Sequence, residues 1–192
     1  MRPAILLDKD GTLIDDVPFN VDPDRVRLAR GAADGLSRLA GAGYALAMVS
    51  NQSGVALGRF PAEALDGVTR RIAELLAPTG VVIEGWHFCL HAPDAGCACR
   101  KPRPGLLLEA ARRHGLDLSR SWMVGDILDD IEAGHRAGCR GAVLVDNGNE
   151  TVWHLGEARV PDHRAPDLAR AADWILAQRQ ATPARLALGQ AS

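Results

Sequence analysis

The chain begins with an apolar run that leads directly into two aspartates and a glycine, Ile5-Leu6-Leu7-Asp8-Lys9-Asp10-Gly11-Thr12. If the apolar run is a β-strand, Asp8 and Asp10 leave its end on roughly one side, because side chains two residues apart point to the same face. Two carboxylates held that close repel each other unless a cation lies between them. The stretch therefore predicts a Mg²⁺ site with a reactive carboxylate, although an Asp-Gly pair after a strand is also compatible with a simple turn.

Apolar segments alternate with amphipathic segments along most of the chain. We expect strands at about 3–8, 44–49, 81–88, 122–124 and 141–145, and helices at about 31–42, 61–77, 103–114, 129–137 and 165–178. This alternation predicts an α/β fold, a doubly wound, Rossmann-like parallel sheet of about five core strands flanked by helices. The second-strand region carries no large insertion, so we expect no large cap domain. Residues 1–180 should form a single domain and 181–192 a frayed tail.

Length and composition are those of an ordinary globular protein of 192 residues, 47% hydrophobic and 24% charged, with a formal net charge of −2. No apolar run is long enough to cross a membrane, and acidic residues arrive too early for a signal peptide. This slightly negative net charge provides no overall electrostatic attraction to nucleic acid. We expect a cytoplasmic monomer that binds neither membranes nor nucleic acid, with His154 and His163 at its surface.

Three of the four cysteines gather in one short segment together with a histidine, as Cys89-x-His91-x5-Cys97-x-Cys99. In a reducing cytosol this clustering favours a metal over disulfides. Three thiols and one imidazole form a complete tetrahedral set for zinc that leaves no position for water, so the predicted site is structural. The alternative is three unrelated buried thiols and a surface histidine.

Both lysines of the chain lie beside candidate chemistry, although arginines make up the rest of its 22 basic residues. Lys9 separates the two aspartates, and Lys101 follows Arg100 directly after the last cysteine of the zinc loop. We interpret Arg100 and Lys101 as cations that bind phosphate. Arg100 can donate two parallel hydrogen bonds from its guanidinium group, whereas Lys101 presents a compact positive charge. Chance placement in an arginine-rich chain, or a solvated basic turn, is the simpler alternative.

Two polar loops are expected near the same aspartates. The second strand runs into Ser50-Asn51-Gln52-Ser53-Gly54. Its hydroxyl, carboxamide and backbone N–H groups suit phosphate oxygens, although a generic polar loop would look the same. The loop after the first strand contains Asp16 and Phe19 and is a candidate for contact with substrate. Phe19 is compatible with either a core anchor or a lid over the ligand.

The fourth expected strand ends in Gly125-Asp126, so three strand ends would converge with Lys101 at the carboxyl edge of one sheet. Carboxylates, Mg²⁺ and a lysine describe a phosphoryl-transfer site. We hypothesise that Asp8 attacks phosphorus to form an aspartyl-phosphate, while Asp10 acts first as acid and then as base. Asp8, the Asp10 backbone carbonyl and Asp126 would hold Mg²⁺. Lys101 would stabilise the equatorial phosphate oxygens.

These motifs resemble those of the haloacid dehalogenase superfamily of Mg²⁺-dependent phosphatases, over the chain from Asp8 to about Asn147. The four superfamily motifs correspond to Asp8-Lys9-Asp10-Gly11-Thr12, Ser50-Asn51, Lys101, and Gly125-Asp126 with Asp129-Asp130. The resemblance implies that Asp8 is the nucleophile, Asp10 the acid and base, and Asp126 a Mg²⁺ ligand. It also implies substrate contacts from Ser50, Asn51, Gln52, Ser53, Arg100 and Lys101.

The zinc loop is similar to that of two small families without a cap domain, the D-glycero-D-manno-heptose 1,7-bisphosphate 7-phosphatases and the histidinol-phosphatases. The segment from Ser50 to Phe60 and the loop around Pro18 to Val21 resemble the heptose enzymes. The resemblance therefore implies a small sugar bisphosphate as substrate, D-glycero-D-manno-heptose 1,7-bisphosphate, which would lose its 7-phosphate. The short zinc-loop spacer is closer to the histidinol type, which keeps histidinol phosphate as the alternative. Ile127 departs from the basic residue that the heptose enzymes often carry there.

Two alternatives come from other functional classes. The chain could pass the aspartyl-phosphate to a sugar as a phosphotransferase, or it could be a catalytically idle binding module. Three uncompensated carboxylates kept together argue against the idle module, because such a site has no electrostatic reason to retain them.

Overall fold

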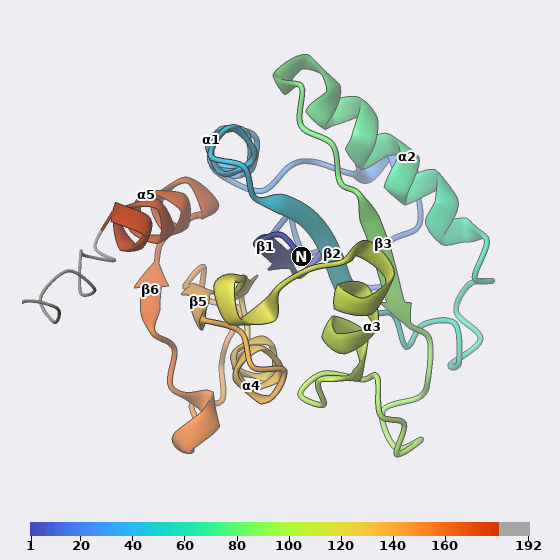
Figure 1. Cartoon of the computed structure of the whole chain (residues 1–192). Coiled ribbons are helices and arrows are strands. Elements are labelled where there is room, and N and C mark those ends of the chain that lie inside the picture. The colour runs from blue at the N-terminus through green and yellow to red at the C-terminus, as the bar shows by residue number, and fades with distance from the viewer. Residues whose placement is uncertain (181–192) are drawn as a thin grey trace, which may run out of the picture.

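The computed structural model describes residues 1–180, which form one six-stranded parallel sheet (Figure 1). Its strands are Ala4–Leu7 (β1), Ala45–Asn51 (β2), Gly85–Cys89 (β3), Trp122–Gly125 (β4), Gly141–Val145 (β5) and His163–Ala165 (β6). They lie in the order β3-β2-β1-β4-β5-β6, and every neighbouring pair is parallel. The expected doubly wound α/β fold is therefore confirmed. The tail expected at 181–192 lies outside the described residues.

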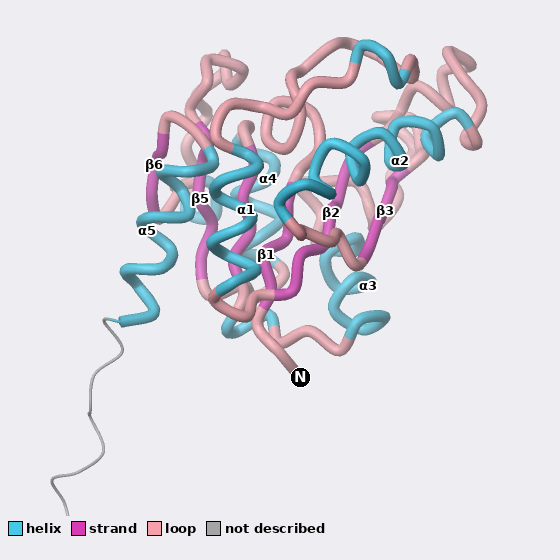
Figure 2. Tube along the Cα trace, turned by 90° about the horizontal axis from the view of Figure 1, so that it is seen from above, coloured by secondary structure: helices cyan, strands magenta, loops and turns pink. Residues whose placement is uncertain are grey.

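Helices cover both faces of this sheet, as Figures 1 and 2 show. They are Ala32–Gly41 (α1), Ala64–Leu76 (α2), Gly105–His114 (α3), Leu128–Arg136 (α4) and Leu168–Gln180 (α5). Ile5 and Leu7 of β1 pack in one core with α1, α2 and α5, whereas Leu6 packs in the other with α3 and α4. Because both faces are buried, β1 carries apolar residues without alternation. No helix in residues 1–180 is long and apolar enough to span a membrane.

The carboxyl ends of the strands open into the loops that carry the candidate chemistry. In Figure 2 the longer loops lie together at the end of the molecule opposite the N-terminus. Strand β1 lies between β2 and β4, and the strand order reverses at this central position. Such a switch point leaves a crevice outside the strand ends, where α/β sheets bind ligands.

The structure corrects several expected boundaries. A sixth strand forms at 163–165, so Ala165 belongs to β6 and the last helix begins only at Leu168. The strand is short and includes charged residues, so it shows no apolar alternation in sequence. His163 is not a free surface residue, because it is half-buried and stacks on Trp174 with ring centroids 4.8 Å apart. His154 is exposed, as expected.

Two helices and one strand start later than their sequence patterns indicate. Helix α2 begins at Ala64, so Pro61 precedes it, and Pro104 likewise stands just before α3. Strand β3 begins at Gly85, although Val81 and Ile83 upstream are buried. Burial of a connecting segment produces the same apolar signal as a strand, which explains the early prediction.

Candidate active site

Residues that follow three adjacent strands line one cavity at the carboxyl edge of the sheet. Asp8 follows β1, Ser50 and Asn51 close β2, and Asp126 follows β4. The cavity measures about 280 Å³ and is lined by Asp8, Asp10, Asp16, Ser50, Asn51, Arg100, Lys101, Asp126, Ile127, Asp129 and Asn149. It brings together the residues expected to handle phosphate and Mg²⁺, except for Phe19, Gln52 and Ser53, which lie outside its lining.

Lys101 is the buried cation of this cavity. Its side chain is 2% exposed, and its Nζ lies 2.5 Å from Asp8 Oδ1 and 2.5 Å from Asp130 Oδ1. The same Nζ donates a hydrogen bond to the Val49 carbonyl at 3.0 Å. A lysine loses a large hydration energy on burial, so it remains charged here only because the two carboxylates compensate that cost.

Asn51 anchors the backbone of Lys101. The Asn51 amide donates to the Lys101 carbonyl and accepts from the Lys101 N–H, each at 3.1 Å. Strand β2 therefore fixes the segment that enters from the zinc loop. The expected contact of Asn51 with substrate stays a prediction, and this positioning of Lys101 is a contact that the sequence pattern did not indicate.

Asp130 belongs to the fourth sequence motif, but the sequence indicated no individual role for it in the site. It lies in the first turn of α4, is completely buried, and contacts Lys101 as described above. A Cβ at Gly125 would lie 2.3 Å from Asp130 atoms, so only glycine leaves room for this carboxylate. Acidic residues in a first helical turn are common because they favour the helix dipole, so the position of Asp130 alone does not indicate its contact with Lys101.

Three buried carboxylates share this single ammonium. Oxygens of Asp8, Asp126 and Asp130 lie within 4.8 Å of one another. Burial, followed by the charges of Asp130 and Asp126, raises the pKa of Asp8 well above its ordinary value despite Lys101. Burial and Asp130 raise the pKa of Asp126 to about 7. With one ammonium against three carboxylates, two negative charges remain, so the donor set fits a hard divalent cation such as Mg²⁺.

Removal of divalent cations is expected to destabilise the fold more at about pH 8 than at about pH 5. The pKa of Asp126 is higher in the folded chain than the ordinary aspartate value of 3.8. The folded state then holds the proton more tightly, so stability falls as the pH rises from about 4 through about 7. A bound cation favours the ionised carboxylates and removes this penalty. Thermal unfolding in EDTA and in Mg²⁺ checks this, and equal Mg²⁺-dependent shifts at both pH values would contradict it.

Asp10 is held apart from the three clustered carboxylates. Its side chain accepts hydrogen bonds from Lys9 Nζ and from Gln52 Nε2, both at 2.8 Å, and is 29% exposed. Gln52 also donates to the Ser50 hydroxyl at 2.9 Å. A carboxyl group that lines the cavity and meets solvent can exchange protons, which is the chemistry expected of an acid and base.

Gly11 lets the chain turn directly after Asp10 and pass close to the side chain of Asp126. Its φ is +78°, and a Cβ there would lie 2.0 Å from Asp126 Oδ2. A larger residue would be strained in its backbone and would also displace that carboxylate. The glycine of the opening motif is therefore required by the packing of the site.

Beyond Asp10, the loop after β1 contributes one further lining residue. Asp16 lines the cavity, and partial burial and the charge of Asp10 raise its pKa. Phe19 is 51% exposed, so it is not a core anchor, and its ring lies 5.6 Å from the Arg59 guanidinium carbon. Ser53 is half-buried outside the lining. Contacts of these residues with substrate stay predictions.

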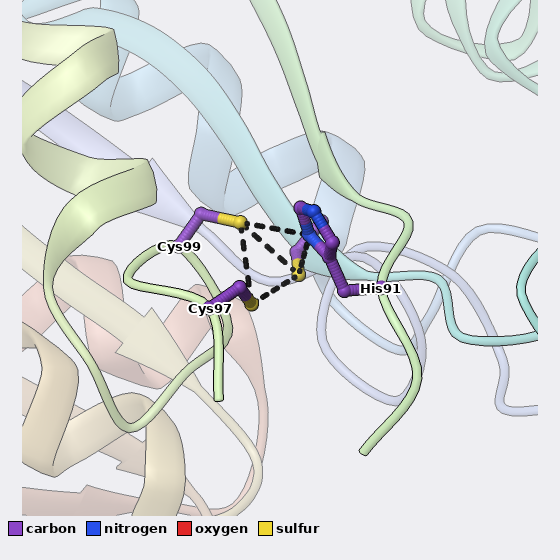
Figure 3. A group of neighbouring side chains, drawn as sticks. His91, Cys97 and Cys99 are labelled. Atoms are coloured by element: carbon purple, nitrogen blue, oxygen red, sulfur yellow. Dashed lines mark hydrogen bonds between the residues drawn. The ribbon is translucent and has the colours of Figure 1, made fainter. Parts of the chain in front are cut away.

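The three zinc-loop cysteines and His91 converge on one point (Figure 3). The Sγ atoms are 3.3–3.6 Å apart, and His91 Nδ1 lies 3.6 Å from Cys89 Sγ and 3.3 Å from Cys99 Sγ. Four tetrahedral ligands at Zn–S distances of about 2.3 Å would place the sulfurs about 3.8 Å apart. The cluster can therefore hold zinc after a small expansion. Burial and the neighbouring thiols raise the pKa of Cys99 to about 12, which a bound cation would reverse.

The zinc loop places Arg100 at the junction of two cavities. Arg100 and Lys101 line both the 280 Å³ cavity and a neighbouring cleft of about 540 Å³. Arg100 Nη1 is buried and has no hydrogen-bond partner among residues 1–180. Arg103, which lines the cleft, donates to the Cys97 carbonyl at 2.6 Å and so ties the cleft to the loop. The buried guanidinium nitrogen offers a donor to an anionic ligand.

Comparison with known proteins identifies relatives over almost the full chain. Residues 98–171 match the HAD-hydrolase-like family model. The D-glycero-beta-D-manno-heptose-1,7-bisphosphate 7-phosphatase of Yersinia pestis is 38% identical over 181 residues, which cover 91% of this chain and 89% of the relative. The D-glycero-D-manno-heptose-1,7-bisphosphate 7-phosphatase of Thermosynechococcus vestitus is 37% identical over 187 residues, which cover 91% of this chain and 95% of the relative.

A solved structure has the same architecture. It is the D,D-heptose 1,7-bisphosphate phosphatase of B. bronchiseptica in complex with magnesium and phosphate. It is 35% identical in sequence, and the match has a TM-score of 0.81 over 92% of this chain and 99% of that one.

Proposed function

Because the chain belongs to the D-glycero-D-manno-heptose-1,7-bisphosphate 7-phosphatase family of HAD-like hydrolases, we propose that it removes the 7-phosphate from that heptose bisphosphate. Lys101, buried between Asp8 and Asp130 at the end of β1, is the observation that carries the proposal. A cation in this position can stabilise the negative charge that gathers when the Asp8 carboxylate meets a phosphate ester. The similar solved enzyme, which holds magnesium and phosphate, supports the same reading.

The proposed reaction begins with attack of Asp8 on the phosphorus of the ester. The P–O bond to the sugar breaks as the new bond to Asp8 forms, and Asp10 gives its proton to the departing alkoxide. Asp10 then takes a proton from water, which attacks phosphorus and releases inorganic phosphate from Asp8. Mg²⁺ bound by Asp8, the Asp10 backbone carbonyl and Asp126 would balance the charge between carboxylate and phosphate.

Lys101 and its partners support both steps. Lys101 Nζ remains within 2.5 Å of Asp8, where it can donate to the equatorial oxygens of a transferring phosphoryl group. Burial lowers the pKa of this ammonium, but the charges of Asp130 and Asp8 outweigh burial and raise it, so Lys101 stays protonated at neutral pH. Asp130 therefore acts on the reaction through Lys101.

The cleft beside the cavity suits the second phosphate of a bisphosphate. Its volume is about 540 Å³, and Arg100 lies at the junction with the site of hydrolysis. In the described part of the chain, Arg100 Nη1 has no hydrogen-bond partner, so it can donate to the distal phosphate. Ile127 lines the catalytic cavity and contributes no charge. We therefore assign recognition of the distal phosphate chiefly to Arg100.

A substrate panel tests the proposed function. We expect kcat/KM for the heptose 1,7-bisphosphate to exceed that for histidinol phosphate or a heptose monophosphate by about 10²-fold or more, because a monophosphate provides no second phosphate for Arg100 Nη1 to bind. Phosphate release should require Mg²⁺, with EDTA as control, and ³¹P NMR should show that the 1-phosphate is retained. A preference for histidinol phosphate would contradict the proposal.

The same assay separates the remaining alternatives. A phosphotransferase would yield little free phosphate until an acceptor sugar was supplied, and a binding module would yield none. We also infer that residues 1–180 form one domain, since the described strands all lie in a single sheet. The expectations of a monomer and of a cytoplasmic location stay predictions.

A further inference from the structure

The segment from Asn147 to Glu150, which follows β5, contacts three other parts of the catalytic edge. Asn147 Nδ2 donates to the Gly11 carbonyl at 2.6 Å, and Asn149 Nδ2 donates to Asp126 Oδ2 at 2.7 Å. Glu150 Oε2 accepts from the Leu128 N–H, at the start of α4, at 2.7 Å. One short segment thus connects the loop after β1, the end of β4 and the first turn of α4.

Asp126 is held through both of its carboxylate oxygens. Thr12 Oγ1 donates to Oδ1 at 3.2 Å, and Asn149 Nδ2 donates to Oδ2. Asn149 is in turn fixed by its backbone N–H, which donates to Asn147 Oδ1 at 3.0 Å. Two donors on opposite oxygens fix the rotation of the carboxylate, and each oxygen keeps lone-pair capacity for a further contact.

We propose that Asn149 is a positioning residue that orients Asp126 to bind Mg²⁺. The proposal rests on the proposed function only in that Asp126 is taken as a metal ligand. Outer partners that hydrogen-bond a ligating carboxylate typically affect metal affinity or activity by about 10–100-fold. Asn149 suits this role because its amide donates to Asp126 without adding charge to a site that already holds three carboxylates.

The test is a Mg²⁺ titration of the whole chain followed by thermal unfolding, because a ligand that binds the folded state raises the melting temperature. Asn149→Ala removes the donor, and Asn149→Leu removes it while keeping a side chain that branches at the same carbon. Asn149→Gln keeps an amide donor. Thr151→Ala, at an exposed position just after the segment, is the matched control.

We expect Asn149→Ala and Asn149→Leu to need about 10-fold more Mg²⁺ than wild type for half of the stabilisation. Asn149→Gln should fall between them and wild type, and Thr151→Ala should match wild type. A purely structural role would instead lower the melting temperature in EDTA and leave the Mg²⁺ midpoint unchanged. Unchanged midpoints in the donor-free variants, or no Mg²⁺-dependent stabilisation of wild type, would overturn the proposal.

This titration uses no sugar phosphate, so its outcome is independent of the substrate assignment. If the wild-type chain binds Mg²⁺ and the donor-free variants bind it more weakly, the role of Asn149 stands even where heptose bisphosphate proves a poor substrate. In steady-state assays with any accepted ester, the donor-free variants should recover kcat at raised Mg²⁺, as expected of a residue that acts through the metal ligand.

Discussion

Asp8→Asn is expected to lower kcat for phosphate release by about 10⁴-fold or more. Asparagine nearly matches aspartate in shape, so the side chain can still contact Lys101, but a neutral amide is a very poor nucleophile towards phosphorus. The change relieves repulsion among the three carboxylates but, among the described residues, leaves Asp130 as the one charged partner of the buried Lys101, so the two effects oppose each other and we expect only a small change in thermal stability. Phosphate release under saturating substrate and Mg²⁺ measures the effect, with circular dichroism to verify the fold.

Asp66→Asn is the matched control for this substitution, because Asp66 is an exposed carboxylate on α2, away from the cavity. It should retain full activity. An Asp8→Asn chain that folds normally and keeps wild-type turnover would exclude Asp8 as the nucleophile.

Cys99→Ala is expected to lose the zinc ion and most of the activity together. The cluster offers four ligands, and with three it would bind zinc much more weakly, so the content should fall from about one ion per chain to near none. Cys99 directly precedes Arg100 and Lys101, whose placement in the cavity depends on the loop. We expect kcat/KM to fall by at least about 100-fold, since displacement of catalytic groups by about 1 Å can have this effect.

Cys139→Ala provides the control, because Cys139 lies outside the cluster of Cys89, His91, Cys97 and Cys99. Burial raises the pKa of its thiol to about 12, as expected for an unreactive packing residue. This variant should keep its zinc, its activity and most of its stability. Elemental analysis measures the zinc content, and the melting temperature measures the stability. Full activity of a zinc-free Cys99→Ala protein would show that the loop does not position Arg100 and Lys101.

The sequence predicted the fold well where strands are continuous apolar runs between loops. Strand β5 was expected at 141–145 and has those bounds, because every residue of it is buried. Strand β2 extends to Asn51, two residues beyond the apolar run, since Ser50 and Asn51 pair with Phe88 and Cys89 of β3. Backbone pairing of polar residues leaves no hydropathy signal, and the edge strand β6 escaped prediction for the same reason.

The candidate site was predictable where residues follow strand ends or repeat a metal-ligand spacing. Asp8 and Asp126 meet because parallel strands end at one edge, and the cysteine cluster follows from its spacing. Contacts across long sequence separations could not be predicted. Asn51 hydrogen-bonds the Lys101 backbone, and Asn149 hydrogen-bonds Asp126. Both contacts depend on how β2 and the segment after β5 pack against other loops.

The most direct test of the central claim is to trap the phosphoryl group on the enzyme. Acid quenching during turnover of the heptose bisphosphate with Mg²⁺, followed by peptide mass spectrometry, should find a phosphorylated aspartate at position 8 in wild type. The Asp8→Asn chain should show no phosphorylated peptide. Rapid turnover without any phosphorylated Asp8 peptide at any quench time, or a phosphoryl group on another residue, would contradict the account.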